Sequence, residues 1–577
     1  MTQPEELGER GFGPRPLAVA VALTLFLLAT SIYISLRLGG LPWPIIFSVI
    51  ASAGIMRALA GMKQVSVHEI NVAQAGGTIG GLMASAVAFT VPGILFLRDT
   101  MGVDIDMIDP PTLALVCVAG ATLGVLLSIP LRRVYVDEEQ LPYASGTAGA
   151  EVLKTQMAGG SGALLIAFTV LLAGIFALTR DLYFPLFTLS ALASYGVVIY
   201  IFLMPLGVGI GYILGPRIAF NSWFGGAVVG SLAIVPFLVA RDWAAGDATA
   251  LVQNLGMGLV LGGGIGFFAA YVVPRIKRIF APLFSQEGPW YMRLSPVVSL
   301  VAFVILALAG APLLIAVVGV LGVWVMSTVA ARMTGETDID PLEQFGIIVG
   351  LASIGLYSLL GRDLGYLSAF VIVIFVSVAT AVAGDIGQDY KSAKLIGTRP
   401  LDIIKVDLIC AIVAGLAAPF LLDIVLTGYA DVLFTAQMPA PQAQLVAGSI
   451  FGFAHPQAFY AGFGLAFVYE VVTRLTKRQL PFSTMAFGIG MFLGMTLGIL
   501  LAAGGIIRYV VSRRYPEREG TGILVSAGLM GGEGIAGFLA AALFVVGVAY
   551  TAALQGILAV FAVILVLSAI YTVWKRG

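Results

Sequence analysis

The chain of 577 residues has few charges for its length: 59% of its residues are hydrophobic, 11% are charged, and the formal net charge is zero. A soluble globule of this size needs more polar surface than that, so the composition excludes a soluble protein. The basic residues are dispersed through loops and give no sign of nucleic-acid binding.

Long apolar runs follow one another along the chain. Examples are PLAVAVALTLFLLATSIYISL near the start, PTLALVCVAGATLGVLLSIP from residue 111 and YLSAFVIVIFVSVATAVAG from residue 366. Each reaches the roughly 20 residues that cross a bilayer as a helix. We expect an all-α polytopic membrane protein with about sixteen transmembrane helices. The runs at 184–214 and 295–332 are each one tilted helix or two.

Lysine and arginine gather in some connecting loops and are missing from others. Basic clusters near residues 132, 277, 476 and 575 place those loops in the cytoplasm. The acidic loop 98–109 and the loop 424–441, which has no lysine or arginine, are expected outside. Both termini are thus expected on the cytoplasmic side of the cell's inner (plasma) membrane, with residues 1–16 as a retained tail. Basic residues both precede and follow 480–504, so this segment is either an exception to the rule or a broken or re-entrant element.

Three short similarities pair the two halves of the chain. NVAQAGG at 71 resembles DIGQDYK at 385, LPYAS at 141 resembles LPFS at 480, and GYILGP at 211 resembles GLMGGE at 528. Their common order suggests a duplicated unit, so we expect two related membrane repeats, 17–290 and 291–577. Duplicated bundles with broken helices at matching places are typical of secondary transporters, in which the substrate site lies where the halves meet.

The stretch LPYASGTAGAEVLKT, at 141–155, is polar although long apolar runs flank it. Non-helical chain at membrane depth must face protein or a wet cavity, because unpaired backbone groups are costly in lipid. We therefore expect it to line a cavity, where its substrate contacts would be Tyr143, Ser145, Thr147, Glu151 and Lys154. The other interpretation is a surface loop entering a helix, with Glu151 and Lys154 as a solvated pair.

Two further groups of polar residues are candidate substrate contacts. Asp385 and Asp389 lie around Gln388 at a spacing that places both carboxylates on one helical face, toward the substrate or a metal, or else at a solvated helix end. Asn71 and Gln74 begin an apolar helix, where amides either bind a ligand or bridge helices. The similarity of Gln74 and Gln388 favours the ligand.

One acidic residue lies in an otherwise small and apolar segment, GLMGGEGIAGF. An ionisable group at membrane depth is costly, so Glu533 is a functional candidate, and we expect it to carry a coupling proton. The alternative is a structural pair with an arginine. Asp385 and Glu151 are further candidates for proton coupling.

The sequence gives no sign of a metal site or of a cofactor other than the coupling proton. The chain has two histidines and two cysteines, His68, His455, Cys117 and Cys410, in none of the spacings that hold zinc. A chelated metal would therefore travel inside its chelator, and no disulfide is expected.

Six motifs in order resemble the oligopeptide transporter family: HEINVAQAGGTIGG, LPYASGTAGAEVLKT, GETDIDP, GDIGQDYKSAKLIG, MPAPQAQL and SAGLMGGEGIAG. The resemblance implies about sixteen helices and a proton-coupled symporter of short peptides, peptide-like conjugates or metal chelates. It adds Gln442, in the fifth motif, to the expected substrate contacts. The Asn-Pro-Gly and Lys-Ile-Pro-Pro-Arg motifs of the eukaryotic peptide branch are absent, so the chain is more similar to the prokaryotic and yellow stripe-like side.

The expected function is secondary active, proton-coupled symport of short oligopeptides or peptide-like conjugates by alternating access. Uptake of metal–chelate complexes, of the siderophore or nicotianamine kind, is the alternative. A membrane-embedded hydrolase would need a nucleophile beside a base, for which there is no suitable spacing, so we expect a transporter and not an enzyme. A channel would differ by moving its solute without concentrating it. The expected partners are this solute and the lipid bilayer, with a homodimer left open.

Overall fold

The computed structural model describes residues 8–39, 44–60, 65–157, 162–183, 187–197, 199–201, 203–272, 274, 295–337, 340, 342–435, 437–476 and 482–545. These residues fall into two compact units, and each unit gathers separate stretches of the sequence. Unit 1 comprises Met1–Gly160, Phe268–Asp423 and Ala440–Gly452, and unit 2 comprises Ser161–Phe267, Ile424–Pro439 and Phe453–Gly577. Helices α11 and α17 continue from one unit into the other.

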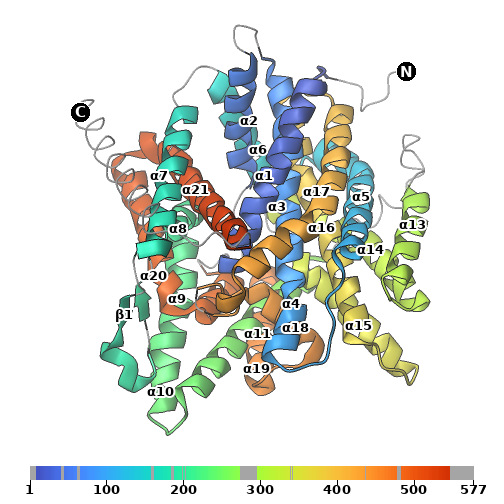
Figure 1. Ribbon diagram of the computed structural model, residues 1–577. Helices are drawn as coiled ribbons and strands as arrows, with labels where there is room; N and C mark the ends of the chain where they lie inside the picture. The colour runs from blue at the N-terminus through green and yellow to red at the C-terminus, as the bar shows by residue number, and fades with distance from the viewer. Residues whose placement is uncertain are drawn as a thin grey trace. The chain divides into compact units, whose positions relative to one another are not determined.

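Unit 1 is a bundle of helices around α16. Its helices are α1 (Pro14–Leu38), α2 (Pro44–Ala60), α3 (Val67–Thr90), α4 (Pro92–Leu95), α5 (Pro110–Arg132), α6 (Ala144–Met157), α13 (Ser295–Leu308), α14 (Leu313–Thr337), α15 (Leu342–Leu359), α16 (Tyr366–Ile396), α17 (Pro400–Gly428) and α18 (Pro441–Phe451), with π-helical turns η2 (Phe96–Thr100) and η3 (Arg133–Glu138). Helix α16 is apolar on every side over its first two thirds and is buried there between α3, α5, α14 and α15, as expected for the central helix of a bundle (Figure 1).

Unit 2 is built on two closely packed helix pairs, α7 with α21 and α8 with α20 (Figure 1). Its elements are α7 (Gly162–Tyr183), β1 (Phe187–Leu189), η4 (Ser190–Tyr195), β2 (Ile199–Ile201), α8 (Pro205–Ile218), η5 (Ala219–Phe224), α9 (Gly225–Val228), η6 (Val229–Ile234), α10 (Val235–Val239), α11 (Ala245–Val272), η10 (Ala430–Val432), α19 (Pro456–Leu475), α20 (Thr484–Arg514), η11 (Pro516–Arg518) and α21 (Glu519–Val545). The two three-residue strands pair antiparallel.

The helices of the second half of the chain recur in the order of the first. Helices α1, α2 and α3 begin at Pro14, Pro44 and Val67, and α14, α15 and α16, which begin at Leu313, Leu342 and Tyr366, follow at similar intervals. In unit 2, the series α7, α8 and α11 is matched by α19, α20 and α21. This order agrees with a duplicated chain, and the repeat boundaries at 17–290 and 291–577 stay a prediction.

The residues that suggested the repeat lie at positions that do not correspond in the two series of helices. Gln74 is near the start of α3 but Gln388 is near the end of α16, and Gly211 is on α8 whereas Gly528 is on α21. Pro481 lies outside the described residues. Helix order is therefore better evidence for duplication than these short similarities.

The prediction of an all-α polytopic membrane protein is confirmed. Among the described residues, 12 helices are long and apolar enough to cross a membrane. The expected number of about sixteen spans stays a prediction. The run 295–332 is two helices, α13 and α14. The run 184–214 was wrongly expected to be helix throughout, because its β-branched and aromatic residues form the short hairpin of β1 and β2 before α8 begins.

Candidate functional site

Helix α3 presents three polar side chains on the face that packs against α16. The helix starts at a capping box, in which the Ser66 hydroxyl accepts from the amide of His68 and the Glu69 carboxylate accepts from the amide of Ser66. From this fixed start, the spacing of Asn71, Gln74 and Thr78 places them on one face. All three side chains are buried.

These side chains meet acceptors and donors from α16 and the loop after it. The amide of Gln74 donates to Oδ1 of Asp389 at 2.9 Å, and the hydroxyl of Thr78 donates to Oδ2 of Asp389 at 2.9 Å. The amide of Asn71 donates to the Thr398 hydroxyl at 3.0 Å. Asn71 and Gln74 thus bridge helices in this structure, which was the alternative to ligand binding, and Asp389 points into the bundle.

Asp407 on α17 is a buried carboxylate that the sequence analysis missed. It is fully buried in an apolar helix, and neither of its oxygens has a hydrogen-bond partner among the described residues. It lies close enough to Asp389 for the two charges to interact. The signal was present in the sequence, because an aspartate in the apolar run DIIKVDLICAIV is costly at membrane depth. We call Gln74, Thr78, Asp389 and Asp407 the buried carboxylate cluster.

The polar stretch at 141–155 forms α6 and the turn before it. Tyr143 has a left-handed φ of 41° and is buried; its amide donates to the carbonyl of Gly335 and its hydroxyl donates to the carbonyl of Ala331. The amide of Gly146, in the first turn of α6, donates to Oε1 of Gln388 at 2.7 Å. Gln388 therefore occupies the start of α6, in the stretch that was expected to line a substrate cavity.

The rest of α6 presents polar groups to its surface. Glu151 and Lys154 form an ion pair of 2.9 Å, and their side chains are 64% and 47% exposed. Thr147 donates to the carbonyl of Pro142, and Ser145 is buried. Of the residues expected here, Glu151 and Lys154 are thus the most exposed, Thr147 is partly exposed, and Tyr143 and Ser145 are buried.

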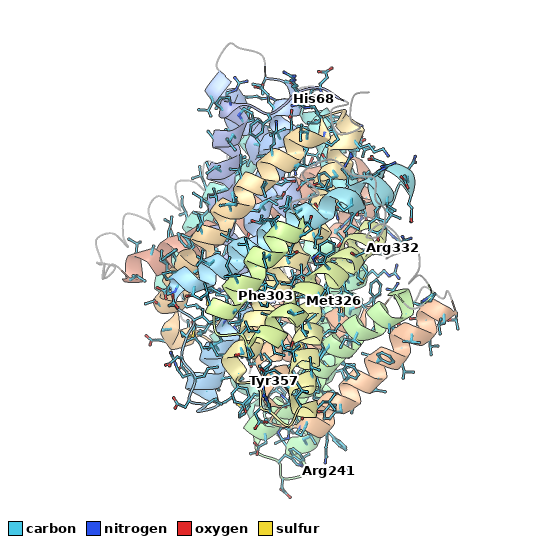
Figure 2. All side chains as sticks on the ribbon, turned by 90° about the vertical axis from the view of Figure 1, so that its right-hand side faces the viewer. His68, Arg241, Phe303, Met326, Arg332 and Tyr357 are labelled. Carbon is cyan, nitrogen blue, oxygen red and sulfur yellow. The ribbon has the colours of Figure 1, made fainter. Side chains whose placement is uncertain are left out.

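A buried arginine fixes the segment before α6. Arg332, labelled in Figure 2, lies near the end of α14 and binds Glu139 through two bonds of 3.0 and 2.8 Å. Its guanidinium lies over the Tyr135 ring. A bidentate pair of this kind holds both planes in one orientation. Lys391 and Lys394 on α16 add bonds to the carbonyls of Leu141 and Val136. The entry to α6 is therefore rigidly attached to α14 and α16.

Asp385, expected to bind substrate or a proton, is half-buried beside a second carboxylate, Asp340. Burial raises the pKa of Asp340 well above its usual value, and the negative charges of Asp385 and Glu343 raise it further. A Cβ atom on Gly384 would lie 2.5 Å from Oδ2 of Asp340 and 3.2 Å from the hydroxyl of Thr334. These oxygens have no hydrogen-bond partner in the described part of the chain.

Gln442, on α18, was an expected substrate contact. Its side-chain amide donates to the carbonyl of Gly39.

In unit 2, Glu533 is fully buried on α21 and accepts a hydrogen bond of 2.9 Å from the amide of Leu206. Leu206 is in the first turn of α8, where amides have no partner within the helix and the helix dipole is positive. Glu533 therefore stabilises the start of α8.

Helices α8 and α20 are both broken at a glycine. Gly215 has φ 76° and ψ 172°, and Gly494 has φ 68° and ψ −167°, which are conformations that glycine adopts without strain. Pro216 removes the amide that would bond the carbonyl of Tyr212. Arg508 takes over by donating to the carbonyls of Ile213, at 2.6 Å, and Tyr212. The break in α20 falls within the segment for which the charge pattern allowed a broken element.

The described residues contain no group of three or more His, Cys, Asp or Glu side chains arranged to hold a metal ion. What the clusters offer is a set of buried carboxylates and amides inside apolar helices, together with two interrupted helices. Such features are typical of proteins that move solutes and protons across membranes.

A family model described as OPT oligopeptide transporter protein matches residues 12–276 and 287–544. The chain belongs to this family. A Haemophilus influenzae protein named "Putative oligopeptide transporter" is 27% identical over 581 residues, which cover 86% of this chain and 90% of that protein. The resemblance found in the six motifs is confirmed. This member of the oligopeptide transporter family is a multi-pass membrane transport protein and not an enzyme.

Proposed function

We propose that the protein is a secondary active symporter that takes up short oligopeptides or peptide-like conjugates with protons, by alternating access. The peptide substrate follows the family and the name of the Haemophilus relative. The proposal of proton coupling rests on the fully buried carboxylates in apolar helices, which are Asp389, Asp407 and Glu533. Removing the proton from a carboxyl group buried among apolar helices costs free energy. Proton binding is therefore linked to the conformation of these helices.

Helix direction supports alternating access. The start of α3 bonds the end of α16 through Gln74 and Asp389, and Gly93, after the end of α3, lies against Phe370 near the start of α16. The two helices therefore run antiparallel although they hold the same place in the two series of helices. Inverted repeats of this kind give a carrier two related conformations that open to opposite sides.

Substrate recognition is proposed for the surface of α6. An oligopeptide at neutral pH carries one carboxylate and one ammonium group, and Lys154 and Glu151 offer one charge of each sign three residues apart. The substrate would exchange their mutual ion pair for two pairs with its own ends. Because an exposed ion pair is worth only about 0–1 kcal/mol, breaking it costs little.

The charge distribution supports an inner-membrane protein with both termini in the cytoplasm. Cysteine accessibility tests this orientation. A cysteine introduced in the acidic loop 98–109 should react with a membrane-impermeant maleimide on intact cells, and one introduced beside Arg133 should react only after the cells are opened.

Purified protein in liposomes tests the function. With an acidic exterior, labelled trialanine should accumulate inside above its external concentration, and a protonophore should abolish the accumulation. Equilibration without accumulation would indicate a channel, and release of free alanine would indicate a hydrolase. A ferric chelate that accumulates while trialanine does not would favour metal–chelate uptake.

A further inference from the structure

Asp407 and Asp389 differ in how their charges are satisfied. Asp389 accepts one hydrogen bond on each oxygen, from Gln74 and Thr78. Asp407 accepts none from the described residues, although it is fully buried. A buried carboxylate without donors is stable only when it is neutralised. The neutralising group has to be a proton or a cation.

A second atom at this place also has no partner. Oε1 of Gln74 is buried and unbonded within the described chain, while its amide nitrogen bonds Asp389. A protonated Asp407 supplies a donor where the neighbouring helices present acceptors: this amide oxygen and the spare lone pairs of Asp389. Gln74 and Asp389 thus have acceptor capacity left for the O–H group of a protonated Asp407.

Close packing of the helices brings the groups together. A Cβ atom on Gly76, between Gln74 and Thr78, would lie 2.7 Å from Cγ2 of Val406 and 2.8 Å from Sγ of Cys410. Glycine at this position allows α17 to approach α3 with Asp407 next to the contact. Substitution by a larger residue would push the two helices apart.

No positive group balances the two carboxylates within the described structure. Neighbours of α17 close to this level include Ala20 and Thr24 on α1 and Gly76 on α3, none of them charged. Asp389 on α16 is the charged group that acts on Asp407, and Asp385 acts in turn on Asp389. On α17 itself, the Cys410 thiol interacts with Asp407, and the exposed Lys405, two residues from Asp407, lies over the Phe12 ring.

We propose that Asp389 and Asp407 form one proton-binding pair that holds a single proton at neutral pH, resident on Asp407, and that this pair carries the coupling proton. Uptake forms one O–H bond on an Asp407 oxygen and lowers the charge of the pair from minus two to minus one; release to solvent reverses it. The pair is preferred to Glu533 because the Glu533 carboxylate already accepts the amide of Leu206 at a helix start, whereas neither oxygen of Asp407 has a hydrogen-bond partner among the described residues. The coupling role rests on the proposed function, whereas the proton site does not.

Infrared spectroscopy of the full-length protein tests the site directly. Wild type at pH 7 should show a protonated-carboxyl band, to which Asp340 also contributes, that loses part of its intensity in Asp407→Asn and none in Asp423→Asn, an exposed aspartate on the same helix. An unchanged band in Asp407→Asn would overturn the proposal. So would a thermal stabilisation of wild type by sodium chloride over choline chloride that is absent in Asp407→Asn, because the neutralising group would then be sodium.

Transport separates the site from its role. In liposomes, Asp407→Asn should lose accumulation of trialanine driven by a pH gradient, yet retain at least half of the wild-type exchange of labelled for unlabelled trialanine at equal pH. Accumulation by Asp407→Asn at the wild-type level would refute the coupling role. If wild type itself accumulates nothing while the infrared band depends on Asp407, the proton site stands and the proposed function fails.

Discussion

Arg508 donates to the carbonyl oxygen of Ile213 at 2.6 Å, on the turn of α8 that Gly215 and Pro216 interrupt. Its other nitrogens donate to Glu519 at 3.0 and 2.8 Å. One guanidinium thus bonds the broken turn of α8 and a residue of α21 at once. The contribution of this contact to the stability of the protein can therefore be measured by replacing Arg508, with Gly215 and Pro216 left unchanged.

Replacing Arg508 by alanine should destabilise the protein by about 1–3 kcal/mol, because the carbonyls at the break lose a charged donor. Lysine should recover only part of this, since it lacks the forked geometry. Thermal unfolding in detergent measures both. Arg514→Ala, at an exposed arginine of the same helix, is the control, and an equal loss there would contradict a specific role for Arg508.

Glu533→Gln should keep the fold, because the amide oxygen still accepts from Leu206. Glu533→Leu leaves that amide unpaired and should cost about 1–3 kcal/mol. If the Asp389–Asp407 pair carries the coupling proton, Glu533→Gln should also keep uptake driven by a pH gradient. Loss of that uptake with exchange intact would return the coupling proton to Glu533.

Asp340 gives the thermal stability a dependence on pH. Its pKa in the folded protein is raised, by burial first and then by Asp385 and Glu343. Asp340 therefore costs no stability at a pH below its pKa in the unfolded chain, about 3.9. The cost increases as the pH rises from there toward its pKa in the folded protein. Asp340→Asn should raise the melting temperature at pH 7, with a difference from wild type that shrinks toward pH 4. A difference independent of pH would contradict this, and exposed Asp363→Asn is the control.

Gly146→Ala should cost about 1–3 kcal/mol, since its Cβ would collide with the carbonyl oxygen of Gln388 and push α6 from α16. Gly355→Ala, in a helix with open space around it, is the matched control and should gain about 0.5–1 kcal/mol from helix propensity. Similar melting temperatures for the two variants would argue against the close contact of α6 with α16.

Lys154→Ala should raise the concentration of trialanine needed for half-maximal uptake at least tenfold and leave the melting temperature unchanged. The pair with Glu151 is exposed, so its loss costs at most about 0.5 kcal/mol of stability. Lys405→Ala controls for the general loss of one positive charge. Uptake by Lys154→Ala at wild-type affinity would remove α6 from the substrate site.

The apolar runs predicted the helix class because a spanning helix needs only length and hydrophobicity. The Gly-Pro pair at 215–216 could have located the break in α8, since proline withholds an amide. The break at Gly494 has no such signal among many glycines. Whether a polar residue faces a partner or a ligand depends on helix pairing, which the sequence of a single chain does not contain: Gln74 and Asp389 each looked free, and they bind each other.

The opposed directions of α3 and α16 have an electrical consequence. The dipole of a helix places partial positive charge at its start and partial negative charge at its end, and two neighbouring helices in opposite senses largely cancel along their common axis. Asp389 and Gln74 lie where the positive end of one helix adjoins the negative end of the other. The axial field of the backbone therefore largely cancels at these side chains. If the proposed pair carries the coupling proton, the two helix dipoles add no net barrier to its passage in either direction.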